Sequence, residues 1–252
     1  YNWSIIGHDR ELENLEKDVE SGNLAHAYLL IGPNSIGKST VAKKLAGILQ
    51  CENDFCHECT TCIQVQKGCH PDTIEISDDG GSIKIEEIRR LVERLNLSAQ
   101  SRYKVTLLQS IERMTLEAAN SFLKILEEPP PKTIFIMTAN NVRLLLPTVV
   151  SRVRVIKFHS VSVPYLKERL RGLYPDRDEE EINQASVFSL GRTGKAVHLM
   201  ENKDELASYI KIYHEVQNFL DYRSLVERFS YVENLLETEG QVDVFLDLLV
   251  HV

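Results

Sequence analysis

Residues 32–40, GPNSIGKST, have the types and spacing of a loop that binds phosphate. They follow the apolar run AYLLI and precede the helix-like segment VAKKLAGIL. Backbone N–H groups of such a glycine-rich turn can surround a phosphate, and the helix beginning near Lys38 adds the positive end of its dipole. Lys38 supplies a charge for the β and γ phosphates, and Ser39 supplies a hydroxyl for Mg²⁺. The predicted nucleotide-binding residues are Gly32, Pro33, Asn34, Ser35, Ile36, Gly37, Lys38, Ser39 and Thr40.

Hydrolysis of a bound nucleotide needs acids that this loop does not contain. An acidic residue at the end of a neighbouring strand must hold Mg²⁺, and a glutamate usually orients the attacking water. The best candidate strand, KVTLL, runs into Gln109 and Ser110 at the positions where those acids are required. A neutral amide oxygen is a poor substitute for a carboxylate as a Mg²⁺ ligand. The chain alone is therefore predicted not to hydrolyse ATP; the competing interpretation of the loop is a glycine turn that binds nothing.

Other acids keep a second interpretation open. Asp78 and Asp79 follow the strand TIEIS, whose alternating pattern suits a partly exposed sheet edge better than the sheet centre. Glu112 comes three residues after Gln109 and is expected on the next turn. A true ATPase that recruits Asp78, Asp79 or Glu112 for Mg²⁺ is the competing hypothesis, and a kinase of a small metabolite is a weaker one. Glu127 and Glu128 precede three prolines and are interpreted as a solvated helix end.

Four cysteines within a dozen residues form a second candidate site. The spacing C-x4-C-x2-C-x2-C is made by Cys51, Cys56, Cys59 and Cys62. Four thiolates match a closed, tetrahedral Zn²⁺ site with no open position for catalysis. An iron–sulfur cluster and unligated thiols are the alternatives. Cys69 is then left over, and His57 and His70 are expected to be surface histidines, since four cysteines complete the coordination shell.

These residues lie in a chain whose strand-like and helix-like segments alternate up to about residue 158. Strand-like runs cover residues 28–31, 72–76, 104–108, 133–137 and 153–158. Helical spacing of apolar residues covers 83–97 and 115–127. Because parallel strands need crossover connections, this alternation predicts a parallel, doubly wound α/β sheet. Strand signals vanish from residue 162, and helices are predicted over 162–172 and 178–189, from 192 or 193 onward, and from 205.

Composition is that of an ordinary globular protein. The chain has 252 residues, of which 43% are hydrophobic and 26% are charged, and its net charge is −8. This negative charge argues against a protein whose whole surface binds nucleic acid. No apolar run approaches the roughly 18 residues of a membrane span, and the polar start is not a signal peptide. A cytoplasmic protein is predicted, and the absence of an initial Met suggests a fragment of a longer chain. A locally basic region that could contact DNA contains Lys84, Arg89, Arg90, Arg94, Arg102 and Lys104. Arg89, Arg90 and Arg94 are interpreted as the solvated face of their helix, and DNA binding is expected only within an assembly.

Taken together, these segments resemble the bacterial DNA polymerase III clamp loader, a family of AAA+ proteins. The resemblance covers about the first 200 residues and is carried by WSIIGHDR, HAYLLIGPNSIGKST, the cysteine module after the loop helix, CHPD, EAANSFLKILEEPPPKTIFIMTAN and PTVVSRV. It implies an AAA+ domain over residues 1–158 with a zinc module at 51–62. It also implies a helical lid over 159–202 and the start of a helical collar domain over 203–252.

Within this family, motor subunits carry intact hydrolytic motifs and delta-prime-type subunits do not. The chain resembles the delta-prime type, because the acids are missing and GRTGKA aligns Gly194 with the lid arginine, with Arg192 and Lys195 beside it. Arg152 in SRV matches the family's serine–arginine–cysteine motif, which implies a finger reaching the ATP site of an adjacent motor subunit. Without the family, Arg152 is an unremarkable arginine between a loop and a strand. Asn140 matches the family's polar sensor residue.

The resemblance also implies the partners and cofactors. The chain would be the stationary arm of a hetero-pentamer with motor subunits and a delta subunit. It would help to load the sliding clamp onto primed DNA, and would meet the sliding clamp and the primer-template DNA only through the assembly. Zn²⁺ would be structural, and ATP or ADP would be held without turnover. The alternative within the family is an ATP-hydrolysing gamma/tau-type motor subunit.

Overall fold

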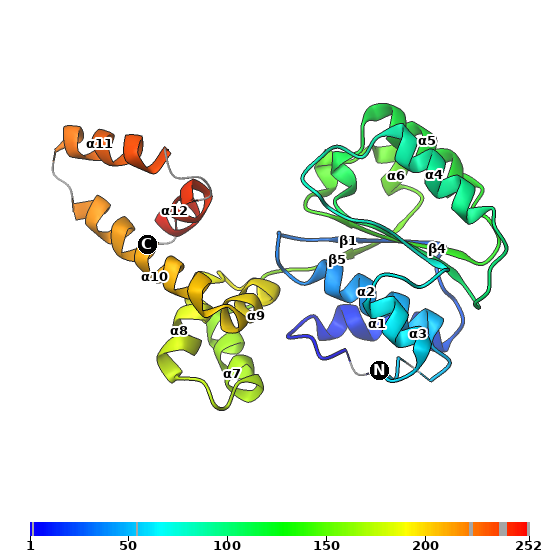
Figure 1. The fold of residues 1–252 in the computed structure, drawn as a ribbon, viewed down its shortest axis with the longest axis horizontal. Coiled ribbons are helices and arrows are strands. Elements are labelled where there is room, and N and C mark those ends of the chain that lie inside the picture. The colour runs from blue at the N-terminus through cyan, green and yellow to red at the C-terminus, as the bar shows by residue number, and fades with distance from the viewer. Residues whose placement is uncertain (2, 54, 222–223, 237–240, 251–252) are drawn as a thin grey trace. The chain divides into compact units, whose positions relative to one another are not determined.

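The structure is a computed structural model that describes residues 1, 3–53, 55–221, 224–236 and 241–250. The chain divides into two compact units, Tyr1–Ser160 and Val161–Val252, and each is described by itself (Figure 1). Within the segment 203–252, predicted to begin a collar domain, residues 222–223, 237–240 and 251–252 lie outside the described part of the chain.

A five-stranded parallel sheet forms the centre of the first unit. Its strands are β1 (Ala27–Ile31), β2 (Thr73–Ile76), β3 (Lys104–Leu108), β4 (Thr133–Ala139) and β5 (Arg154–Lys157). They lie side by side in the order β2-β3-β4-β1-β5, and Leu29 of β1 is in register with Met137 and Val155. The predicted parallel α/β sheet is confirmed. Strand β2 is at an edge, as its alternating pattern indicated, and β1 is interior.

Helices cover both faces of this sheet (Figure 1). One face carries α1 (Asp9–Glu20), α2 (Lys38–Gln50) and α3 (Thr60–Gln66), and the other carries α4 (Ile85–Leu95), α5 (Leu116–Glu127) and α6 (Pro147–Val150). Because side chains alternate along a strand, Tyr28 and Leu30 of β1 join the core on the α2 side. Leu29 and Ile31 join the core on the α5 side. All of β1 is buried, so the loop that follows it starts from a fixed point.

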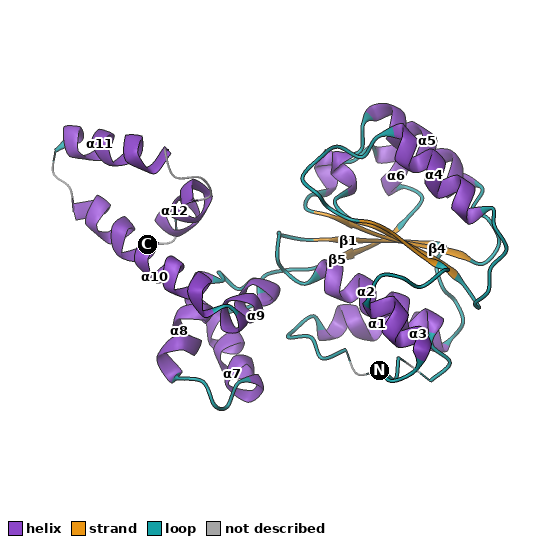
Figure 2. Cartoon of the chain, in the orientation of Figure 1, coloured by secondary structure: helices purple, strands orange, loops and turns teal. Residues whose placement is uncertain are grey.

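In the described residues of the second unit, helices joined by loops are the regular secondary structure (Figure 2). Its helices are α7 (Val163–Leu173), α8 (Glu179–Phe188), α9 (Thr193–Glu201), α10 (Lys203–Asp221), α11 (Leu225–Leu236) and α12 (Gln241–Leu249). Helix α10 contacts α8, α9 and α12, and fully buried leucines of the unit include Leu166, Leu170 and Leu199. None of the helices in the described residues is long and apolar enough to cross a membrane.

Two polar side chains of the first unit are buried where surface positions were expected. His70 Nδ1 lies 3.1 Å from Thr73 Oγ1, and burial lowers the pKa of His70. The expectation that His70 is a surface residue was wrong. Lys104 is also buried, and its Nζ donates to the carbonyl oxygens of Leu95 (2.7 Å) and Leu97 at the end of α4. A cation there satisfies carbonyl groups that a helix end leaves unpaired, so Lys104 contributes nothing to an exposed basic surface.

Candidate functional site

The candidate phosphate loop joins the end of β1 to the start of α2. Gly37 precedes α2 with φ = 105°, in the left-handed region that glycine adopts without strain. Gly32 lies so close to Phe158 that an added Cβ would be 2.6 Å from the Phe158 carbonyl oxygen. The Gly32 N–H also donates to the Ala139 oxygen of β4 (3.2 Å). The loop is therefore fixed by contacts from both strands that neighbour β1. Of its other residues, Ile36 is buried, whereas Pro33, Asn34, Ser35 and Thr40 are exposed.

Lys38 places its ammonium group among oxygen atoms at this loop. Its Nζ donates to the carbonyl oxygens of Gly32 (2.6 Å) and Pro33 (2.8 Å) and to Asn140 Oδ1 (3.1 Å). Burial lowers the pKa of Lys38 to about 8, and the negative charge of Glu112 partly opposes this effect. Because the three partners are neutral, the positive charge of Lys38 is available to an anion such as a phosphate.

Ser39 contacts an amide at the position where a metal-binding acid was sought. Its Oγ donates to Gln109 Oε1 at 3.4 Å, and Gln109 Nε2 donates to Glu75 Oε1 at 2.7 Å. The same Glu75 oxygen lies 3.0 Å from Lys43 Nζ. Gln109 follows β3, which is separated from β1 by β4, so its side chain reaches Ser39 across one strand. A neutral carbonyl oxygen, and not a carboxylate, thus faces the serine hydroxyl.

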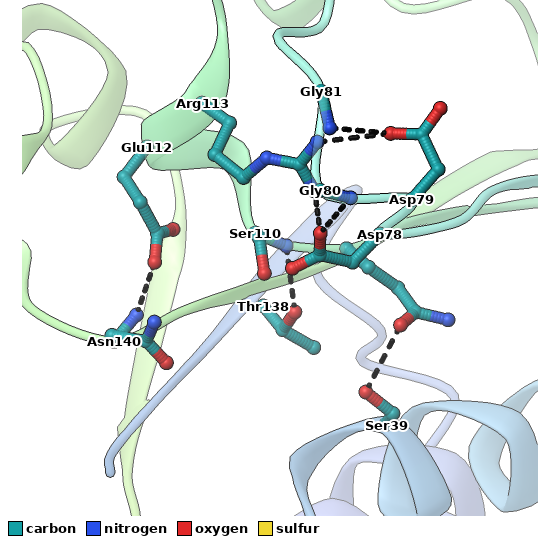
Figure 3. A network of polar contacts seen from close by, with 11 residues as sticks. Ser39, Asp78, Asp79, Gly80, Gly81, Ser110, Glu112, Arg113, Thr138 and Asn140 are labelled. Atoms are coloured by element: carbon teal, nitrogen blue, oxygen red, sulfur yellow. Dashed lines mark hydrogen bonds and ion pairs between the residues drawn. The ribbon is translucent and has the colours of Figure 1, made fainter. Parts of the chain in front are cut away.

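Asp78 and Asp79, the acid pair after β2, both form ion pairs with an arginine (Figure 3). Arg113 forms ion pairs with both Asp78 and Asp79, at 2.9 Å for Asp79. The two carboxylates also accept backbone N–H groups, Asp78 from Gly80 (3.1 Å) and Asp79 from Gly81 (2.9 Å). These contacts hold the acids within their own turn, and neither of them contacts Ser39 in the described part of the chain.

Glu112 lies beside Asn140, the residue after β4, which its place in the sequence did not suggest (Figure 3). It lies in the short helix η1 (Ile111–Arg113), and its Oε1 accepts the backbone N–H of Asn140 at 3.0 Å. Asn140 in turn holds Lys38 through its side chain. The second carboxylate oxygen of Glu112 is buried and has no hydrogen-bond partner in the described residues. The turn after β3 therefore brings one acid back to the end of β4, which spacing along the chain did not reveal.

The four spaced cysteines converge on one point. Their Sγ atoms all lie within 4.8 Å of one another, with separations of 3.9 Å for Cys51–Cys56, 3.8 Å for Cys51–Cys59 and 3.9 Å for Cys56–Cys62. A tetrahedron with metal–sulfur bonds of about 2.3 Å has edges of about 3.8 Å. Backbone N–H groups, first those of Glu58 and Cys59, lower the pKa of Cys56 to about 7, which favours the metal-binding thiolate. These cysteines could hold one metal ion.

The cysteine cluster is packed against the helix that starts at the phosphate loop. Cys51 directly follows α2, and its N–H donates to the Gly47 oxygen (2.9 Å). The ring of Phe55 lies on Gly47 so closely that an added Cβ would be 2.3 Å from Cε2 of the ring. Phe55 and Cys62 belong to the same buried core as Leu45 of α2. His57 is exposed, as expected. The cluster thus covers the far end of α2 from the loop.

Arg152 lies in the turn between α6 and β5, apart from the phosphate loop. Its Nη2 is 2.7 Å from Glu127 Oε1, and its Nη1 donates to the Thr148 oxygen (2.9 Å) and to Ser151 Oγ (3.2 Å). The side chain is 36% exposed. In the described residues its polar contacts are all with α5, α6 and their following turn, and none is with residues 32–40.

Arg192 and Lys195, the cations beside Gly194, form ion pairs within the second unit. Arg192 Nη2 is 2.8 Å from Asp247 Oδ2, and Lys195 Nζ is 3.8 Å from the same atom. Lys195 Nζ also lies 4.5 Å from the ring centroid of Tyr209. Burial, and then the charge of Arg192, lower the pKa of Lys195 to about 8. These two cations therefore hold α9, α10 and α12 together.

A family model described as "DNA polymerase III, delta subunit" matches residues 7–162, which is more than half of the chain. The chain belongs to this family of clamp-loader subunits. The clamp-loader resemblance predicted from the sequence is confirmed at the level of the family. The five-stranded parallel sheet flanked by helices is accordingly the AAA+ fold of this family.

Relatives of two kinds are found in the clamp-loader family. The chain is 30% identical over 242 residues to DNA polymerase III subunit gamma of Buchnera aphidicola subsp. Acyrthosiphon pisum, covering 92% of this chain and 66% of that protein. It is 38% identical over 196 residues to DNA polymerase III subunit delta' of Pseudomonas aeruginosa, covering 74% and 60%. The chain spans between 50% and 66% of the length of the first curated relatives.

A solved structure supports the same fold. It is a DNA polymerase III gamma subunit-related protein from Thermotoga maritima, with a TM-score of 0.53 and 23% identity, covering 94% of this chain and 76% of that one. At this identity the similarity concerns the fold, and the chemistry of the site has to be argued from its residues.

Proposed function

We propose that the chain is a delta-prime-type clamp-loader subunit that holds nucleotide without hydrolysing it. The observation that carries this proposal is the contact between Ser39 Oγ and Gln109 Oε1. In an active site of this kind a carboxylate holds Mg²⁺ beside the serine, and a second acid orients the attacking water. Gln109 and the following Ser110 supply neither charge nor base, while Lys38 keeps the cation for the phosphates.

Arg152 has the properties required of a finger that acts on a neighbouring subunit. A guanidinium is charged at every physiological pH and binds phosphate oxygens with two parallel hydrogen bonds. The side chain is 36% exposed and is directed to residues outside its own phosphate loop. A finger supplied in trans is worth about 10³–10⁵ in the rate of hydrolysis. In this proposal the chain activates the ATP site of an adjacent motor subunit.

The same proposal assigns the remaining parts of the chain. Cys51, Cys56, Cys59 and Cys62 hold one structural Zn²⁺, and residues 32–40 hold ATP or ADP. The AAA+ domain covers 1–158, the lid 159–202 and the start of the collar 203–252. The chain works in the cytoplasm in a hetero-pentamer with motor subunits and a delta subunit, which loads the sliding clamp onto primer-template DNA.

Nucleotide binding and turnover must be measured together to test this function. Titration of the purified chain with ATP and ADP, with and without Mg²⁺, should show binding that Lys38→Ala removes. A turnover assay on the same samples should show no release of phosphate. In the reassembled clamp loader, Arg152→Ala should lower ATP hydrolysis at the adjacent motor subunit by about 10³-fold. Catalytic turnover by the isolated chain, or full activity with Arg152→Ala, contradicts the proposal.

A gamma/tau-type ATPase is the second candidate, and the position of Glu112 favours it. This acid lies beside Asn140 and near Lys38, with one buried carboxylate oxygen lacking a partner in the described residues. Such an oxygen could accept a proton from water or bind Mg²⁺. If the isolated chain hydrolyses ATP and Glu112→Gln stops it while Glu117→Gln does not, this second function replaces the first.

A further inference from the structure

We infer that Glu127 is a positioning residue for Arg152: its carboxylate orients the guanidinium for contact with the nucleotide of a neighbouring subunit. This inference rests on the proposed function of Arg152 as a finger in trans. Glu127 itself touches no nucleotide in this account and acts only through Arg152.

The contacts of Arg152 differ in how firmly they are anchored. Thr148 and Ser151 belong to the short α6 and the turn that carries Arg152 itself, so they move with it. Glu127 comes from a different element, the last turn of α5, and its Oε1 lies 2.7 Å from Arg152 Nη2. In the described part of the chain, Glu127 is therefore the polar contact that ties the guanidinium to the packed layer of helices.

Helix α5 holds Glu127 in a fixed place. Its residues Phe122, Ile125 and Leu126 are buried in the core between α5 and the sheet. The helix ends at Glu127 because three prolines follow Glu128, and a proline disfavours helical geometry in the residue before it. The carboxylate thus projects from a rigid helix end, with 50% of the Glu127 side chain exposed. The solvated helix end expected from the sequence has a definite partner.

The existing contacts leave part of the guanidinium free to bind phosphate. Its five N–H groups lie in a fixed plane, and the contacts described are made by Nη1 and Nη2. No contact of Nε–H is found in the described residues, and Nε–H forms one edge of the guanidinium together with Nη2. Two donors on one edge suit two oxygens of a phosphate. The contact with Glu127 fixes Nη2, which belongs to that edge.

The carboxylate has two opposing effects, and their sizes decide the expected result. Its negative charge reduces the field of Arg152, but for a half-exposed pair water and salt screen that effect strongly. Its geometric effect is not screened, because water and salt weaken charge interactions and do not restrict side-chain rotamers. An arginine without this partner samples many rotamers, and a small misplacement of a catalytic group lowers the rate. Loss of orientation should therefore outweigh the relief from the negative charge.

ATP hydrolysis by the reassembled clamp loader tests this inference. With Glu127→Gln in the full chain, kcat at the adjacent motor subunit should fall by about twofold to fivefold, the size expected for loss of a half-exposed ion pair, while KM for ATP stays unchanged. Glu128→Gln is the matched control, since it removes the neighbouring charge that lies outside the Arg152 contacts, and it should leave kcat unchanged. The thermal midpoint of the isolated chain should fall by no more than a few degrees for Glu127→Gln, as for loss of one half-exposed ion pair, so both variants stay folded.

A double substitution separates positioning from a structural role. Once Arg152→Ala has removed the finger, adding Glu127→Gln should lower kcat no further, because the carboxylate then has nothing to orient. An additional loss in that background, or an unchanged or raised kcat for Glu127→Gln alone, overturns the inference and leaves the finger itself intact. Full activity of Arg152→Ala overturns the proposed function instead.

Discussion

Lys38 carries its charge among neutral oxygen atoms, and burial holds its pKa at about 8. Near neutral pH the ammonium form predominates, but less completely than for a lysine in water. Glu112 supports that charge without an ion pair, and Asn140 contacts both residues. At the scale of single residues, binding of a phosphate therefore depends on a proton that the unliganded loop holds weakly.

Nucleotide affinity should consequently fall at alkaline pH. Because the pKa of Lys38 is lowered to about 8, the cation is present below that pH and is lost as pH rises through it. A bound phosphate favours the charged form, so the dissociation constant should rise by up to about tenfold per pH unit above 8. Nucleotide titrations between pH 7 and 10 measure this. With Lys38→Arg, whose charge persists, the affinity should not change over the same range, whatever its absolute value.

A second prediction concerns the close approach of Gly32 to Phe158. An alanine Cβ would meet a backbone oxygen at 2.6 Å, and backbone cannot move aside as a side chain can. Gly32→Ala should lower the free energy of unfolding by about 1–3 kcal/mol and weaken nucleotide binding. Gly172→Ala is the control, because in α7 a Cβ there meets nothing within 4 Å and should stabilise the helix by roughly 0.5–1 kcal/mol. Equal effects in denaturant titrations would contradict the steric argument.

At the scale of elements, α2 connects the two candidate sites. It begins at Lys38 and ends at Gln50, directly before Cys51. Phe55 and Cys62 pack onto its far end in a core that also contains Leu45. A helix fixed at both ends holds the N–H groups of its first turn in place. The cysteine cluster therefore contributes to the phosphate loop through the rigidity of α2, although it lies at the other end of the helix.

Removal of the metal should test this connection. Cys62→Ser takes away a fully buried cysteine of the proposed zinc site. With that site occupied as proposed, the zinc content should drop from one ion per chain and the first unit should lose on the order of 4 kcal/mol of stability. Nucleotide binding should weaken in parallel. Metal analysis and calorimetry provide the measurements, and Cys69→Ser, at an exposed cysteine outside the cluster, should change neither. Unaltered stability without metal would argue against a structural role for the cluster.

At the scale of the whole molecule, each unit has its own buried core. The sheet and its two helix layers make up residues 1–160, and helices alone make up the described part of 161–252. Leu170 of α7 is completely buried within the second unit. Separate cores allow separate unfolding, because a cavity in one core removes no packing from the other.

Leu170→Ala should therefore destabilise one unit and not the other. Truncation of a fully buried leucine costs about 2–5 kcal/mol, and this loss should appear in residues 161–252 alone. Hydrogen exchange resolved by peptide is the measurement, with peptides from β1 and α2 as the internal reference. Leu45→Ala, at a fully buried leucine of α2, should produce the reverse pattern. Equal loss of protection in both units would mean that they unfold together.

The sequence by itself determined the features that depend on local pattern. Alternation of apolar runs predicted the five strands, and motif spacing predicted the loop after β1 and the convergence of four cysteines, since twelve residues can reach only a small volume. The sequence also shows directly that Gln109 and Ser110, and not acids, stand at the end of β3. Helices α7, α8, α9 and α10 begin close to their predicted positions for the same reason, because helical periodicity needs no distant partner.

Only the tertiary structure decided which distant side chains meet. Ser39 and Gln109 are 70 residues apart, and Asn140 and Glu112 are 28 apart; strand order brings each pair together. The same holds for Arg152 at Glu127, and for the burial of His70 and Lys104. Periodicity describes which face of its own element a residue occupies, whereas these contacts depend on how elements are stacked. The chemistry of the loop is set by that stacking.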